Sequence, residues 1–133
     1  VFLLAIPAFA GLLVVAHAAH GLSIDLGARR NGARGARSRA LRFGLYACGW
    51  DLVIGPLGAV VVAAKEGLSS ALGIVQLASE VPGRATRAFL RGCYRLDGER
   101  AQAARGTAFV GAAIATLFGA VCLLAAIVAL VLA

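Results

Sequence analysis

The sequence is poor in charged residues and especially in acids. Only 14% of its 133 residues are charged, and 6 aspartates and glutamates stand against 13 lysines and arginines. A soluble domain is typically about 25% charged and about 45 to 50% apolar. The 61% hydrophobic content and mean hydropathy of +0.89 therefore argue against an ordinary soluble domain. We interpret residues 1–133 as a single membrane-embedded helical domain, all-α in class.

The sequence also lacks the motifs of enzymes and of disulfide or thiolate metal frameworks. It contains no G-x-S-x-G, P-loop or H-E-x-x-H pattern and no pair of carboxylates at a catalytic spacing. Cys48, Cys93 and Cys122 cannot all pair, and none lies in a C-x-x-C motif. We therefore expect a protein that is not an enzyme, that holds no cofactor and whose cysteines are free thiols.

Two histidines are the only metal or haem candidates. His17 and His20 are three residues apart, so a helix would place them on one face. No carboxylate or cysteine near them in the sequence completes a metal site, and histidine is common at a water boundary. We expect no metal there, and a haem or pigment subunit remains a hypothesis that rests on these two residues alone.

Two uncharged runs are long enough to cross a bilayer. Residues 1–22 and 107–133 carry no lysine, arginine, aspartate or glutamate, and about 20 apolar residues cross about 30 Å of hydrocarbon. The first run resembles a signal peptide in having Ala16 and Ala18 around His17, but no basic residue precedes it, so we interpret it as a span. In the second run Gly111, Ala115 and Gly119 recur every four residues, which predicts a smooth strip for helix packing.

The central residues 43–83 are predicted to form a helical hairpin or a re-entrant segment. Basic stretches lie on both sides of them, and short loops rich in Lys and Arg favour the cytoplasmic side. A hairpin that turns at residues 65–67 places both stretches on that side. A plain chain of three spans, with the stretches on opposite sides, is the alternative. Residues 84–100 are predicted to form an amphipathic helix, either along the lipid headgroups or packed on a partner protein.

The arginines are expected to set the topology and to contact anionic lipid, at about 1 kcal/mol per cation near a charged leaflet. They lack interleaved aromatic residues that could stack on bases, so nucleic acid is not an expected partner. The expected lipid contacts are Arg29, Arg30, Arg34, Arg37, Arg39, Arg42, Arg84, Arg87, Arg91 and Arg95.

Asp51 is the acid with the strongest functional interest, because a carboxylate inside a membrane segment is costly and often handles protons or ions. A structural ion pair with Arg39 or Arg42 is the alternative, since Asp51 lies only about 12 Å along a helix from Phe43.

Three kinds of function remain open. The first is a non-catalytic accessory subunit of a larger membrane assembly, with other subunits or copies of itself as partners. The second is an oligomeric pore or proton conductor that uses Asp51. The third is a protein that shapes membranes through its hairpin and amphipathic helix.

Overall fold

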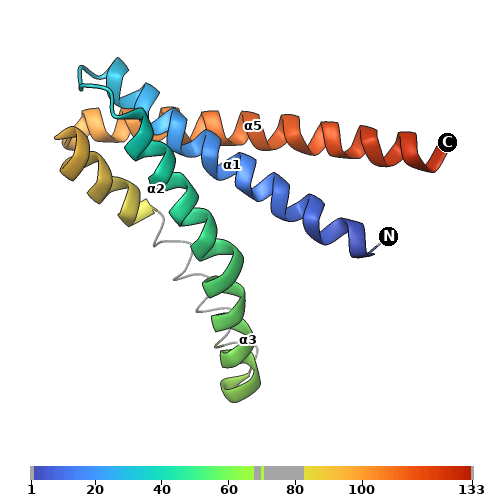
Figure 1. Ribbon diagram of the computed structural model, residues 1–133. Helices are drawn as coiled ribbons and strands as arrows, with labels where there is room; N and C mark the ends of the chain where they lie inside the picture. Colours follow the sequence, from blue (N-terminus) through green and yellow to red (C-terminus); the bar gives the residue numbers. More distant parts are fainter. Residues whose placement is uncertain (1, 68–69, 71–82, 133) are drawn as a thin grey trace.

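The computed structural model describes residues 2–67, 70 and 83–132, and every regular element among them is a helix (Figure 1). In chain order, these are α1 (Phe2–Arg30), α2 (Arg37–Gly49), the π-helix η1 (Trp50–Ile54), α3 (Gly55–Glu66), a helix over residues 83–94, and α5 (Gly98–Leu132). Two of them, α1 and α5, are long and apolar enough to cross a membrane.

Small residues allow α1 and α5 to pack closely as an antiparallel pair. A Cβ on Gly111 would collide with the Ser23 side chain, and a Cβ on Gly119 would come within 2.7 Å of Leu12. Gly27 of α1 likewise lies against the Ala104 backbone, since a Cβ there would come within 2.7 Å of the Ala104 carbonyl oxygen. The predicted packing strip of α5 therefore faces α1, with Ala115 half-buried between its two glycines. Such close approach of backbones is typical of helix pairs in membranes.

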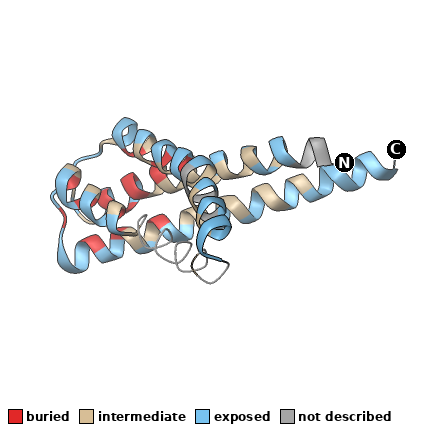
Figure 2. Cartoon of the chain, turned by 90° about the horizontal axis from the view of Figure 1, so that it is seen from below, coloured by how far each residue is buried: buried red, intermediate tan, exposed pale blue. Residues whose placement is uncertain are grey.

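The buried residues gather at one end of this pair, where α2 and the helix over residues 83–94 also pack (Figure 2). Ile24 and Leu90 are the largest fully buried apolar side chains, and Phe43 stacks on Phe89 with ring centroids 4.4 Å apart. Most of the other core residues are alanines. We call this region the packed end.

A buried carboxylate links three segments of the packed end. Asp25 is 1% exposed, and its Oδ1 accepts hydrogen bonds from the Ala36 amide at 2.6 Å and from the Tyr94 hydroxyl at 2.8 Å. Its Oδ2 lies 2.6 Å from the Arg29 guanidinium. Because Ala36 is the N-cap of α2 and has no side-chain cap of its own, Asp25 supplies the negative charge that a helix N-terminus favours. Burial, the Asp25 hydrogen bond and the Asp25 charge all raise the pKa of Tyr94 above its usual range.

The two spanning helices are longer than we expected at their charged ends. We placed their boundaries near residues 22 and 107, whereas α1 continues to Arg30 and α5 begins at Gly98. Hydropathy marks only the part of a helix that suits hydrocarbon, and both extensions are held by packing at the buried core. The amide of Ala33 donates to the Ala28 carbonyl around Gly32, whose φ of +88° allows this turn to end α1.

The amphipathic helix is shorter than predicted, and its apolar face is covered by the chain itself. It ends at Tyr94, where Arg95 takes a φ of +54° and the Leu96 amide returns to the Leu90 carbonyl at 3.1 Å. Leu90, Tyr94 and Leu96 are buried, whereas Arg87 is exposed. The apolar face of this helix is thus part of the buried core, and its position along the lipid headgroups stays a prediction.

The segment from α2 through η1 to α3, here called the arm, diverges from α1 and α5 (Figure 1). It ends at Glu66, and Gly67 follows with a φ of +91°, so the helix stops at the predicted turn. The predicted return leg lies outside the described residues. The chain is again at the base of the arm by residue 83, which lines a cavity with Arg105 of α5.

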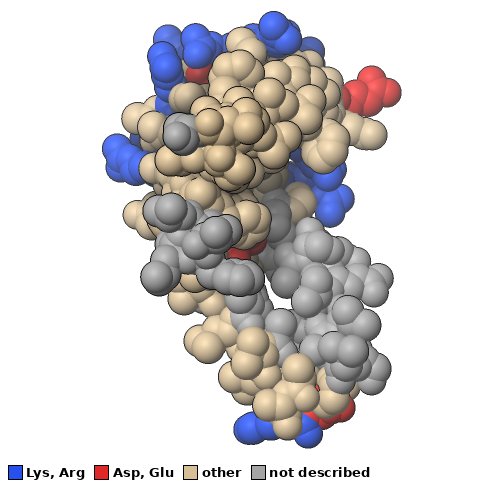
Figure 3. Space-filling view, turned by 90° about the vertical axis from the view of Figure 1, so that its right-hand side faces the viewer, with Lys and Arg blue, Asp and Glu red and all other residues tan. Residues whose placement is uncertain are grey.

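The charges are segregated along the molecule. Figure 3 views it from the side of the chain termini: uncharged surface of α1 and α5 faces the viewer, and Lys and Arg show around the rim behind it. A second basic group, Lys65, lies at the tip of α3 beside Glu66. All ten arginines expected to contact lipid are exposed and belong to the packed end or to its loops: Arg29, Arg30, Arg34, Arg37, Arg39, Arg42, Arg84, Arg87, Arg91 and Arg95.

Candidate functional site

Two glycines bring α2 against α1 at the base of the arm. A Cβ on Gly21 would collide with the carbonyl of Ala40, and a Cβ on Gly44 would collide with the carbonyl of His17. The helices run antiparallel, because residue 21 meets residue 40 while residue 17 meets residue 44. Asp51 lies seven residues after Gly44, which is two helical turns, so it points toward α1 as well.

Asp51 forms an ion pair with His17 of α1. The Asp51 Oδ2 lies 2.7 Å from His17 Nε2, and the two side chains are 37% and 16% exposed, respectively. We expected Arg39 or Arg42 as the structural partner, but neither forms an ion pair with Asp51 in the described part of the chain. The reason is the close α1–α2 packing, which brings a histidine from a distant part of the sequence within reach.

The hydrogen bonds of His17 place a proton between the two side chains. Its Nδ1 lies 2.9 Å from the carbonyl oxygen of Leu13. A carbonyl oxygen can only accept, so Nδ1 carries a hydrogen. A neutral ring would then turn the lone pair of Nε2 toward an ionised Asp51. The 2.7 Å contact therefore needs one further proton, held either by the imidazolium or by the carboxylic acid. The pair is thus one hydrogen-bonded unit that joins α1 to η1.

Asp51 belongs to η1, the only π-helical turn in the described residues. Single π-turns within α-helices are uncommon and often occur at functional sites. Here the wider turn, Trp50–Ile54, ends just before the Gly55–Pro56 pair that opens α3. The proline of this pair cannot donate a backbone hydrogen bond. Asp51 could be singled out from the sequence, but the π-turn could not.

A cavity of about 600 Å³ opens beside the His17–Asp51 pair. Its walls come from α1, α2, η1, the helix over residues 83–94 and α5. Three aromatic rings of the α2–η1 segment line it, Phe43, Tyr46 and Trp50, and four of the remaining nine lining residues are alanines. Its size and apolar character match sites for small apolar or amphiphilic molecules.

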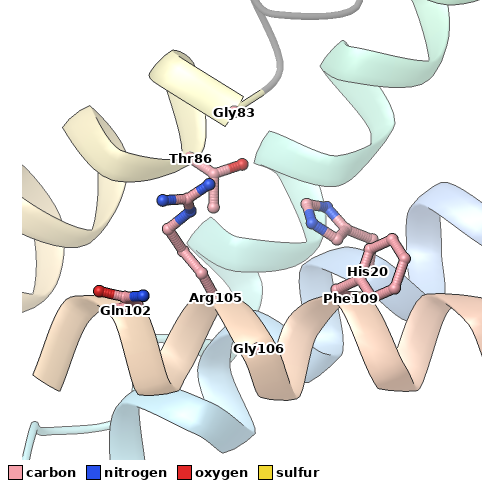
Figure 4. A pocket seen from close by; sticks show the side chains of 7 residues that line it. All are labelled: His20, Gly83, Thr86, Gln102, Arg105, Gly106 and Phe109. Carbon is pink, nitrogen blue, oxygen red and sulfur yellow. The ribbon is translucent and has the colours of Figure 1, made fainter. Parts of the chain in front are cut away.

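A second cavity, of about 450 Å³, adjoins the first and is more polar (Figure 4). The two cavities share His20, Thr86 and Phe109 in their walls. Figure 4 shows Arg105 extending from α5 toward Thr86, with Gln102 one turn earlier on the same helix. Sequence analysis missed Arg105, Thr86 and Gln102 because no local pattern marks them. They come together only when α5 packs beside the helix over residues 83–94.

The structure places the other predicted site residues as follows. Both histidines line the apolar cavity, and within the described part of the chain only His17 has an acidic partner. The described residues contain no group of three or more His, Cys, Asp or Glu side chains that could hold a metal ion. The three cysteines are free thiols: Cys48 is buried, Cys93 half-buried and Cys122 exposed.

Comparison with protein-family models, with curated proteins and with solved structures found no match for this chain, so the arguments that follow rest on its own geometry and chemistry.

Proposed function

We propose that this chain is a non-catalytic subunit of a larger membrane assembly, with its basic packed end at an anionic leaflet. The observation that carries the proposal is where small and large apolar side chains lie: small ones fill much of the core, and many large ones lie on the surface, the reverse of a soluble protein. Half of the buried apolar residues are alanines, whereas large apolar side chains along α5, such as Phe109, Leu117 and Phe118, are 74%, 68% and 71% exposed. Exposing such groups to water costs about 1.5 to 3 kcal/mol each, so an apolar surrounding suits this surface.

The charge distribution supports an orientation. α5 is about 52 Å long, well over the roughly 30 Å of hydrocarbon, so its charged first turns extend beyond the apolar layer. Arg30 at the end of α1 and Arg100 in α5 lie at the same end of the antiparallel pair. The preference of basic segments for the cytoplasmic side places this end in the cytoplasm, at a surface of anionic headgroups.

The arm supports a role in assembly. Val53, Leu57 and Val60 are 60%, 62% and 66% exposed, and a Cβ on Gly58 would meet nothing within 4 Å. The described part of the arm therefore presents apolar side chains and a small residue to its surroundings without packing on α1 or α5 along its outer half. Helices of neighbouring subunits, or the arm of a second copy, can pack on such a surface.

Native electrophoresis after mild solubilisation tests the assembly. We expect the wild-type chain to migrate well above 13.5 kDa, together with its partners. Val60→Trp on the arm should release it, and Val128→Trp near the exposed end of α5 serves as the matched control. Migration of the wild-type chain as a monomer contradicts the proposal. For orientation, a cysteine-free background with Ser38→Cys should react with a membrane-impermeant maleimide only from the cytoplasmic side.

The His17–Asp51 pair favours proton transfer across the membrane, in an oligomer, as a second candidate function. The pair holds a proton beside a cavity, and carboxylates in membrane segments often serve proton relays. Liposomes with an internal pH dye test it. Asp51→Asn should abolish proton flux, and Glu66→Gln at the exposed tip of the arm should leave it unchanged. Equal flux in the wild type and Asp51→Asn, or none in either, eliminates this candidate.

A further inference from the structure

We infer that the two adjoining cavities form one binding site for a single anionic lipid, with its headgroup at Arg105 and an acyl chain along the aromatic cavity. The inference rests on the proposed membrane placement and adds to it a specific ligand position. The polar and apolar cavities lie side by side, because His20, Thr86 and Phe109 line both of them. Their volumes, about 450 and 600 Å³, are each within the range of small-molecule sites.

The polar cavity suits an anionic headgroup. Arg105 is half-buried and has no carboxylate within ion-pair distance among the residues that the structure describes. Its guanidinium extends across the cavity, and Gln102 adds an amide donor from the same face of α5 (Figure 4). A planar guanidinium binds phosphate or carboxylate through paired hydrogen bonds, which makes an anion the matching ligand.

The apolar cavity suits an acyl chain. Phe43, Tyr46 and Trp50 form its aromatic wall, and Ala16 and Ala112 leave room between the helices. The charges also fix the orientation of the ligand. Arg105 attracts the anionic headgroup to the polar end, whereas Asp51 at the apolar end is paired with His17, and a pair that shares one proton carries no net charge.

The orientation agrees with that of a lipid in the leaflet at the packed end. Arg105 is the last charged residue of α5, and the uncharged stretch begins at Thr107. The headgroup cavity therefore lies at the level where α5 passes from charged to apolar, and the chain cavity extends toward the apolar part. A lipid from this leaflet can occupy the site without inverting.

Native mass spectrometry of the full chain in mild detergent tests the site. The probes are phosphatidylglycerol, phosphatidylcholine with the same acyl chains, and glycerol 1-phosphate. We expect one retained phosphatidylglycerol per chain. Arg105→Gln should weaken its binding about tenfold, as the loss of one charge-assisted contact. Arg100→Gln, which removes an exposed arginine of the same helix outside both cavities, should have no such effect.

A second pair of variants tests the apolar half. Ala112→Phe fills the chain cavity and should weaken lipid binding, whereas Ala113→Phe on the exposed face of α5 should not. Equal effects of Arg105→Gln and Arg100→Gln, or glycerol 1-phosphate binding as tightly as the lipid, overturn the inference. Native electrophoresis of Arg105→Gln separates the two proposals, because the larger assembly should persist in this variant when only the lipid site is lost.

Discussion

Tyr94→Phe is the most direct test of the packed end. The Tyr94 hydroxyl is buried and donates to Oδ1 of Asp25 at 2.8 Å, and the acceptor is 1% exposed. The substitution removes this bond but keeps the ring that meets Phe89 edge to face. Hydrogen bonds to charged groups contribute about 1.5 to 3 kcal/mol. We therefore expect the free energy of unfolding to fall by about 2 kcal/mol.

Asp25→Ala should be more damaging than Tyr94→Phe. It leaves the Tyr94 hydroxyl and the Ala36 amide without their acceptor and Arg29 without its ion-pair partner. Each buried donor left without its acceptor costs about 1 to 3 kcal/mol, whereas Arg29 is 53% exposed and adds less. In the double variant the tyrosine bond is already lost, so adding Tyr94→Phe to Asp25→Ala should cost almost nothing further. The cycle should yield a coupling energy of about 0.5 to 3 kcal/mol.

Unfolding in mild detergent, followed by circular dichroism or steric trapping, supplies the measurement. Tyr46→Phe is the matched control, because the Tyr46 side chain is 78% exposed. It should change the unfolding free energy by less than about 0.5 kcal/mol. If Tyr94→Phe costs no more than Tyr46→Phe, or if the two substitutions at 94 and 25 add independently, the buried hydrogen bond does not tie the segments together and the reasoning fails.

Three further predictions concern single positions. Arg95→Gly should stabilise the chain by about 1 kcal/mol in the same unfolding assay, because a φ of +54° suits glycine; a loss of stability contradicts this. Gly44→Val should force α2 away from α1, break the contact between His17 and Asp51 and lower the melting temperature. Gly49→Val should change the melting temperature far less, because a Cβ at Gly49 would meet nothing within 4 Å. In Tyr46→Phe, absorbance at 295 nm should show Tyr94 ionising well above pH 10, because burial and Asp25 raise its pKa in the folded chain. The stabilising contribution of Tyr94 is therefore complete below pH 10 and is lost as pH rises through the higher folded pKa. Ionisation of Tyr94 near pH 10 contradicts its burial.

Local patterns explain which parts of the fold could be predicted. The uncharged runs mark α1 and α5 because their length and hydropathy are properties of continuous sequence. The turn after the arm was predicted at residues 65–67 because charge and glycine interrupt an apolar run there. The helix ends at Arg30 and Gly98 were missed, since arginine is a good helix former and hydropathy alone cannot distinguish a helical extension from a loop.

The candidate site depends on contacts that no local pattern encodes. His17 and Asp51 are 34 residues apart, and Asp25 and Tyr94 are 69 apart. Each residue was visible in the sequence, but its partner is set by how closely the helices approach. Gly21 and Gly44 carried the available signal, since glycines within helices often mark close backbone contact.

The α1 helix organises the molecule because it offers a different small-residue face to each neighbour. Gly27 and Ser23 face α5, while Gly21 faces α2. Among the residues that the structure describes, only two large apolar side chains are fully buried, Ile24 and Leu90, so burial of apolar area there contributes little to specificity compared with a soluble core. Close backbone packing and the buried hydrogen bonds must then select this arrangement among other helix pairings. The polar site at the base of the arm is a consequence, because only helices that approach this closely can bring a histidine to a carboxylate across an apolar interface.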